Sequence, residues 1–164
     1  MNDGHAVDFG SPTEIYEHPR DLFSAQFVSG ANTLHAVVTG VEGGRVSLVL
    51  GGTEARIDAL VPLRAEQPRI GDKVVVAVRP ESLQIGSSGG AGNEVAGHVE
   101  SVTYFGAHSD VIATVGDETV TARVDPRAVA ALDVGDAVTL HLPPDALVVL
   151  NDDTRGGADS SPVT

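Results

Sequence analysis

The chain has no cysteine, no tryptophan and a single lysine in 164 residues, and its aromatic content is only 4%. The absence of cysteine excludes disulfide bonds and thiol catalysis. The one lysine, Lys73, follows an aspartate, so the sequence contains no phosphate-binding loop of the form G-x-x-x-x-G-K-[ST]. A formal net charge of −13 disfavours a nucleic-acid surface, because proteins neutralise phosphates with clustered Lys and Arg. We therefore expect neither nucleotide hydrolysis nor nucleic-acid binding.

Long apolar runs and signals for catalysis or metal binding are also missing. No stretch approaches the ~20 residues of a membrane-spanning helix, and no signal peptide is visible, so we expect a cytoplasmic protein without direct membrane insertion. The six histidines form no i, i+3 or i, i+4 pair, which argues against a preformed metal site. His108, Ser109 and Asp110 are too close in sequence for a catalytic triad, whose members converge from separate segments. The sequence predicts no catalytic residue, no cofactor and no metal.

The most informative feature that is present is an internal repeat. Gly71–Leu83 returns as Gly135–Leu147, and each copy has a Gly-Asp turn, an apolar strand and then Pro-acid-x-Leu. Asn32–Val38 resembles Asn93–Val99 in the same way. A third pair of segments shares the pattern Ala-Arg-apolar-Asp, namely Ala55–Asp58 and Ala122–Asp125. A block of about sixty residues that occurs twice predicts two similar small β units packed on each other.

Nineteen Gly and nine Pro separate short Val-rich runs, a pattern typical of turn-rich β structure. We predict a mainly β protein of tandem small OB-like β-barrel units, preceded by a short helical N-terminal segment. Alternation places Val74, Val76 and Val78, with their repeat counterparts Val138, Leu140 and Leu142, on the inward face. The predicted strands are Thr33–Thr39, Arg45–Leu50, Glu54–Asp58, Lys73–Arg79, Glu94–Phe105, Ser109–Val115, Thr119–Val124, Ala137–Leu142 and Leu147–Leu150.

The predicted domain order follows from the repeat and from Gly-rich or polar joints. Two short helices are expected before the strands: Ser11-Pro12-Thr13-Glu14 is a capping box, and Pro19 opens a second helix that runs to about Val28. The predicted segments are 1–31 as a helical linker, 32–86 as the first β unit, 87–93 as a flexible joint, 94–151 as the second β unit and 152–164 as a disordered tail.

Five side chains are candidates for an interface or a ligand site. Arg79 and Glu81 follow a strand end, where the arginine could bind an anion or a partner, or the two could simply pair and lock the strand end. The second copy has Pro143 in place of Arg79, so the repeat does not require the charge. The remaining candidates are Phe23 and Phe27, one helical turn apart, and Tyr104.

The same residues resemble a known family. Asn2-Asp3-Gly4, Gly10–Tyr16, Pro19, Phe23 and Phe27-Val28 look like the end of the ATP-binding subunit of an ABC importer. The Val-Arg-Pro-Glu of the first copy, Val102–Gly106 and the closing Pro-Pro-Asp-Ala-Leu resemble the regulatory TOBE domain that follows in that family. The nearest subgroup is that of polyamine, ferric-iron and sugar importers.

This resemblance implies a non-catalytic regulatory and dimerisation domain. It implies a homodimer, in a parent system with an ABC ATPase core and a permease complex, and a cytoplasmic place that becomes peripheral at the inner face of the membrane through that complex. ATP-driven import would belong to the full subunit, since its phosphate loop would lie before Met1. The alternative is a free-standing protein that binds a small oxyanion such as molybdate, held by backbone amides at Gly-rich turns. The transported substrate is not indicated.

Overall fold

The computed structural model describes residues 30–61, 67–86 and 92–152, which form ten strands and three short 3-10 helices. The mainly β prediction is confirmed, whereas the predicted N-terminal helices, Phe23 and Phe27 lie outside the described residues. The strands are β1 Asn32–Glu42, β2 Arg45–Leu50, β3 Arg56–Leu60, β4 Lys73–Val78, β5 Gln84–Ile85, β6 Asn93–Tyr104, β7 Ser109–Val115, β8 Glu118–Val124, β9 Ala137–Leu142 and β10 Val148–Asn151. The 3-10 helices are η1 Pro80–Ser82, η2 Pro126–Val129 and η3 Pro144–Ala146.

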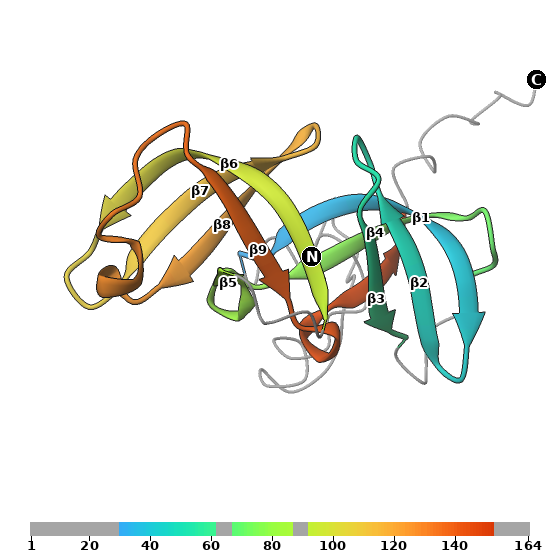
Figure 1. The fold of residues 1–164 in the computed structure, drawn as a ribbon. Helices are drawn as coiled ribbons and strands as arrows, with labels where there is room; N and C mark the ends of the chain where they lie inside the picture. The colour runs from blue at the N-terminus through green and yellow to red at the C-terminus, as the bar shows by residue number, and fades with distance from the viewer. Residues whose placement is uncertain (1–29, 62–66, 87–91, 153–164) are drawn as a thin grey trace, which may run out of the picture.

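The strands form two sheets that lie side by side (Figure 1). One is a closed barrel in the order β1-β2-β3-β10-β4, on the right of the view, and the other is a five-stranded sheet in the order β5-β9-β6-β7-β8, on the left. We call β1 to β4 the first unit and β6 to β9 the second unit. Each unit is a run of antiparallel strands in which the first strand pairs with both the second and the fourth.

The repeat predicted from the sequence reappears as matched backbone geometry. The register of the first strand of each unit shifts as at a β-bulge, between Val38 and Gly40 in β1 and between Val99 and Ser101 in β6. The amide of Gly71 donates to the Val38 carbonyl and that of Gly135 to the Val99 carbonyl, both at 2.8 Å, and both glycines have φ 93°. A side chain would be strained at that φ, which explains why glycine precedes aspartate in both copies.

One part of the predicted repeat is wrong. Strand pairing places Asp58 of β3 opposite Ser47 and Thr121 of β8 opposite Ile112, so these two residues occupy equivalent positions. Ala55–Asp58 therefore does not correspond to Ala122–Asp125, and the prediction is shifted by four residues. Most of this shift arises in the connection: five residues separate β2 from β3, whereas only Gly116 and Asp117 separate β7 from β8, and matching residue types alone does not take this difference of three into account.

The last short strand of each half crosses to the other sheet. β5 follows the first unit but pairs with β9, and β10 follows the second unit but pairs with β4 and β3. Pro80 and Pro144 follow the fourth strands and open η1 and η3, because proline cannot extend a sheet ladder but fits the first position of a helical turn. Sheet pairing thus cuts across the predicted boundaries 32–86 and 94–151, which remain predictions for folding units. We call β5 and β10 the exchanged strands.

A continuous aliphatic core runs through both units. The predicted inward triplets of β4 and β9 all belong to it, so the predicted register is confirmed. β4 is buried on its other face as well, where Ala77 packs with Leu150 of β10. Alternation alone does not predict this second buried face, because it depends on the exchanged strand.

Candidate functional site

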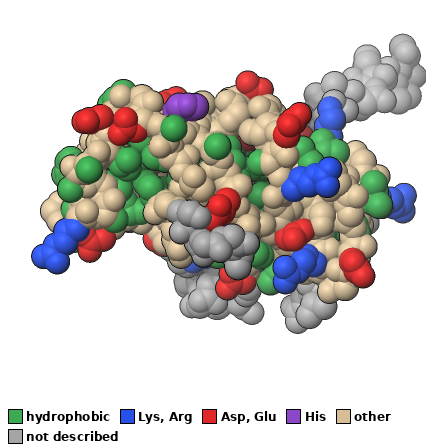
Figure 2. Space-filling model, viewed as in Figure 1, with side chains coloured by type: hydrophobic (Ala, Val, Ile, Leu, Met, Phe, Trp, Pro, Cys, Tyr) green, Lys and Arg blue, Asp and Glu red, His purple; other side chains and the backbone are tan. Residues whose placement is uncertain are grey.

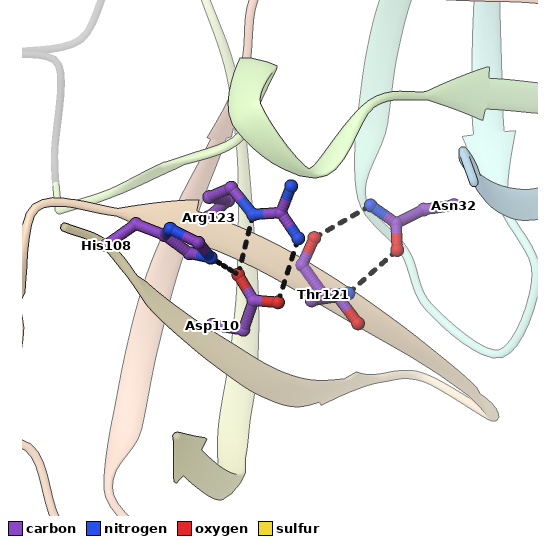
Figure 3. Close-up of polar contacts among 5 residues, drawn as sticks. All are labelled: Asn32, His108, Asp110, Thr121 and Arg123. Atoms are coloured by element: carbon purple, nitrogen blue, oxygen red, sulfur yellow. Dashed lines mark hydrogen bonds and ion pairs between the residues drawn. The ribbon is translucent and has the colours of Figure 1, made fainter. Parts of the chain in front are cut away.

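Two equivalent asparagines join the units through their side chains. The Asn32 Nδ2 donates to the Thr121 carbonyl at 2.9 Å, and the Thr121 amide donates to the Asn32 Oδ1 at 2.7 Å (Figure 3). The Asn93 Nδ2 donates to the Asp58 carbonyl at 2.8 Å and to the Leu142 carbonyl at 2.9 Å, while the Asp58 amide donates to the Asn93 Oδ1 at 2.7 Å. A carboxamide has both a hydrogen-bond donor and an acceptor, so each asparagine bonds to the backbone amide and carbonyl of one residue in the third strand of the other unit. β8 is thereby held against β1.

A second contact between the units lies at their hairpin turns. A Cβ on Gly52 would lie 2.6 Å from the Asp117 Oδ2, and one on Gly116 would lie 2.6 Å from the Gly51 carbonyl oxygen. The His35 amide donates to both carboxylate oxygens of Glu118, at 3.0 Å each, and its ring Nδ1 also contacts that carboxylate. These contacts hold the β7–β8 turn and the start of β8 against β1 and the β2–β3 turn.

The hairpin Tyr104–Ser109, between β6 and β7, carries the one tyrosine and the one phenylalanine of the described part of the chain, Tyr104 and Phe105. Tyr104 and Phe105 are each 57% exposed, whereas the core contains only aliphatic side chains. The Phe105 ring stacks on the His108 ring, with centroids 5.1 Å apart and an interplanar angle of 20°. Because large aromatic side chains gain most from burial, two adjacent exposed ones are unusual. We call Tyr104–Ser109 the aromatic hairpin.

A charged group borders the aromatic hairpin. Asp110 lies directly opposite Arg123 in the β7–β8 pair, and Arg123 donates to both carboxylate oxygens, from Nε at 2.9 Å and from the terminal nitrogen at 3.0 Å (Figure 3). The His108 Nε2 lies 3.8 Å from the Asp110 Oδ1. The hydrogen bond from Arg123 lowers the pKa of Asp110 below its ordinary value, and burial partly opposes this shift. Asp110 and Arg123 therefore remain a charge-balanced pair near neutral pH.

The predicted site residues lie in different segments. Tyr104 is exposed on the aromatic hairpin, as an interface residue requires. Arg79 is half-buried before η1 and Glu81 is exposed within it, and η1 packs against β8. The Arg-Pro-Glu segment therefore forms part of the connection by which the chain passes from β4 of the barrel to β5 of the second sheet. A binding role for Arg79 or Glu81 remains a prediction.

Sequence reasoning missed Phe105, His108 as a stacking partner, and the Asp110–Arg123 pair. Within the described ranges, no group of three or more His, Asp or Glu side chains is placed to hold a metal ion. No helix in the same ranges is long and apolar enough to span a membrane.

Comparisons with known proteins agree on a family. Residues 76–150 match the TOBE domain model, which therefore runs from within β4 into β10. The spermidine/putrescine import ATP-binding protein PotA of Rubrobacter xylanophilus is 36% identical over 142 residues, covering 85% of this chain and 37% of that protein. The Fe(3+) ions import ATP-binding protein FbpC of Rhizobium etli is 31% identical over 156 residues, covering 95% of this chain and 38% of that protein. The chain thus spans well under half the length of these curated relatives.

A solved structure shows a similar fold. The cytoplasmic molybdate-binding protein ModG, with molybdate bound, matches with a TM-score of 0.66 and 24% identity. The match covers 73% of this chain and 95% of that chain. At this level of identity the likeness concerns the fold.

Proposed function

We propose that this chain is the regulatory and dimerisation region of an ABC-importer ATP-binding subunit. The basis is that residues 76–150 belong to the TOBE domain family and that the chain is related to the C-terminal region of such subunits. The observation that carries the proposal is the extent of the family match. It begins in β4 and ends in β10, so it includes both crossings of the chain. The partners in this role are a second copy, the ATPase core and the permease complex. The place of action is cytoplasmic, at the inner face of the membrane.

The role is regulatory and not catalytic. The sequence lacks the phosphate-binding loop, and its only lysine, Lys73, begins β4. ATP hydrolysis then requires the ATPase core of the subunit. The purified chain should show no ATP turnover above that of a mock purification. The class of transported solute in this role is that of the relatives, polyamines or ferric iron.

A chimera tests this function. The C-terminal region of PotA from Rubrobacter xylanophilus is replaced by this chain, and polyamine uptake is measured in cells that carry the cognate permease. We expect uptake well above that of the same PotA without any C-terminal region. The matched control is the chimera with Val149→Asp, which should lose the gain because Val149 is buried in the shared core. A chimera that hydrolyses ATP but imports no better than the truncated subunit would refute the regulatory role.

A second candidate function is supported by the fold of ModG, whose structure contains molybdate. In this role the chain binds a small oxyanion on its own, through backbone amides at its glycine turns. Isothermal titration of the full chain with molybdate, tungstate and sulfate separates the two functions. Saturable heat with molybdate would favour oxyanion binding, and the absence of heat at millimolar molybdate would remove this candidate.

A further inference from the structure

A row of side chains with charged ends and an aliphatic middle crosses the outside of the barrel. Its four residues lie directly opposite one another on adjacent strands, in the order Lys73 of β4, Val37 of β1, Val49 of β2 and Arg56 of β3. Directly opposite residues point to the same face of a sheet, and the residue that follows each of the four along its strand belongs to the core. The row therefore faces outward: both cations are exposed, Val37 is 39% exposed and Val49 is half-buried. We call these four side chains the outer row.

The second unit has the same row with different residues. The equivalent positions, which pair in the same order, are Ala137 of β9, His98 of β6, Thr114 of β7 and Thr119 of β8. The fold thus forms this row without lysine, arginine or valine. The residues of the outer row are therefore not required to build a unit, and they are available for a contact outside the fold.

The charge of the chain is divided unevenly between the two units. The described residues of the first unit, 32–61 and 67–78, carry four Lys or Arg and four Asp or Glu, so their formal charge is zero. Those of the second unit, 93–142, carry two basic and eight acidic side chains, a formal charge of −6. In Figure 2, basic side chains gather over the barrel, on the right of the view. The second unit therefore repels an anionic partner, and the barrel opposes it least.

The two cations of the outer row are not neutralised within the fold. In the ranges that the structure describes, neither Lys73 nor Arg56 forms an ion pair. Two acidic side chains near the row have partners of their own: Asp72 accepts from a backbone amide of its turn at 2.7 Å, and Asp58 accepts from a serine hydroxyl at 2.7 Å. Glu54, two residues before Arg56, is exposed and limits the basic surface on that side.

We propose that the outer row is a docking surface for an extended acidic segment of another protein, with the pattern acid-x-aliphatic-x-acid. Neighbouring strands lie about 4.8 Å apart, so the backbones at Lys73 and Arg56 are roughly 14 Å apart across three intervals. In an extended segment, residues four apart are separated by roughly 13 Å and point to the same side. One acidic side chain then pairs with Lys73 and the other with Arg56, while the aliphatic residue between them covers the two valines.

A protein segment fits the outer row better than a membrane surface does. An anionic bilayer extends beyond the barrel and also meets the second unit, whose formal charge is −6. A short segment contacts the outer row alone. Because the contact is small and exposed ion pairs are weak, the binding is transient and falls as salt rises.

The chain allows a direct test because Lys73 is its only lysine. The probe is the peptide Thr-Glu-Thr-Val-Thr-Glu-Thr, acetylated and amidated at its ends. The control peptide, Glu-Glu-Thr-Val-Thr-Thr-Thr, has the same composition without the spacing. A carbodiimide joins a peptide carboxylate to the Lys73 amine as an amide and takes up the water that is lost. Mass spectrometry of digested full-length protein measures the fraction of Lys73 that carries peptide.

We expect the probe to couple to Lys73 about fivefold more than the control peptide at low salt, because only the probe reaches both cations. Arg56→Gln and Val37→Ser should each lower this coupling about threefold. Arg127→Gln is the matched control, since it removes the same charge from an exposed position of the second unit and should leave the coupling unchanged. Circular dichroism checks that each variant is folded.

Equal coupling of the two peptides would overturn the proposal, as would equal effects of Arg56→Gln and Arg127→Gln. Vesicles of phosphatidylglycerol test the other anionic surface. Sedimentation of the chain with these vesicles that Arg56→Gln abolishes, without selective peptide coupling, would reject the protein segment and assign the outer row to lipid. The peptide result is independent of the importer role, because a failed PotA chimera leaves it unchanged.

Discussion

At the scale of single residues, the equivalent pair Asn32 and Asn93 holds the two units together. Asn93 is 5% exposed and satisfies three backbone groups, whereas Asn32 is partly buried and satisfies two. An unsatisfied buried polar group costs more than a normal hydrogen bond gains. The two asparagines therefore occupy equivalent positions, but Asn93 contributes more to the free energy of unfolding than Asn32.

Replacing Asn93 with alanine leaves the amide and carbonyl of Asp58 and the carbonyl of Leu142 without this partner. We expect the free energy of unfolding to fall by about 1–3 kcal/mol. We expect a smaller fall in Asn32→Ala, because Asn32 satisfies two part-buried backbone groups, whereas Asn93 also satisfies the Leu142 carbonyl through a buried hydrogen bond. Urea unfolding of the two variants and the wild type measures both changes. Equal losses at the two positions would contradict the role assigned to burial.

Asp110 makes stability depend on pH. Arg123 lowers the pKa of Asp110 in the folded state, so the ion pair stabilises the fold above the ordinary aspartate value of 3.8. This stabilisation is lost as the pH falls through the lowered pKa, since the carboxylate then takes up a proton. We expect Asp110→Asn to cost about 0.5–1 kcal/mol at pH 7, and the difference from wild type to shrink below about pH 4. A difference that grows on acidification would show that another group is responsible.

At the scale of elements, the sequence predicts most strands and fails where pairing is distant. Alternating Val and Leu with Gly-rich turns locate β2, β7 and β9 with the observed bounds. β5 was not predicted, because two residues carry no periodicity. The crossing of β10 was not predicted either, since no local pattern states which sheet a four-residue strand joins.

The candidate site was predictable in part. The turn Gly116-Asp117 pairs Val115 with Glu118, and counting back along both strands places Asp110 opposite Arg123. This pair could have been found from the predicted strands alone. The stacking of Phe105 on His108 could not, because it depends on the conformation of a four-residue turn. The exposure of Tyr104 agrees with its prediction as an interface residue, although no local pattern indicates it, since an aromatic residue at a strand end is often buried.

Removal of β10 tests how much the crossing of this strand to the barrel contributes to stability. A chain that ends at Leu147 loses Val149 and Leu150, each 6% exposed, and opens the barrel between β3 and β4. Their burial contributes on the order of 3–6 kcal/mol, which is comparable to the whole stability of a small domain. We expect this chain to lose its cooperative thermal transition, whereas a chain that ends at Asp152 should keep it. A cooperative transition in the shorter chain would mean that β10 only covers a barrel that closes without it.

At the scale of the whole molecule, the two units are interlocked and not merely adjacent. Each sheet contains one strand from the other half, each asparagine contacts the third strand of the other unit, and the hairpin turns at Gly52 and Gly116 touch. The shared aliphatic core continues across the boundary. Such an arrangement predicts one cooperative unfolding transition in place of two.

Separate production of the two halves tests this directly. Residues 1–86 lack the β10 that completes the barrel, and residues 87–164 lack the β5 that extends the second sheet. We expect each half alone to be poorly folded or aggregated, and the mixture to recover a 1:1 complex with the circular dichroism of the intact chain, because the exchanged strands and both asparagine contacts form again without the connection at 87–91. Val76→Asp in the first half is the control, since Val76 is fully buried and its loss should prevent recovery. A first half that is monomeric and unfolds cooperatively by itself would show that β5 can close its own barrel in place of β10, and that the exchange is a choice of partner strand and not a requirement of the fold.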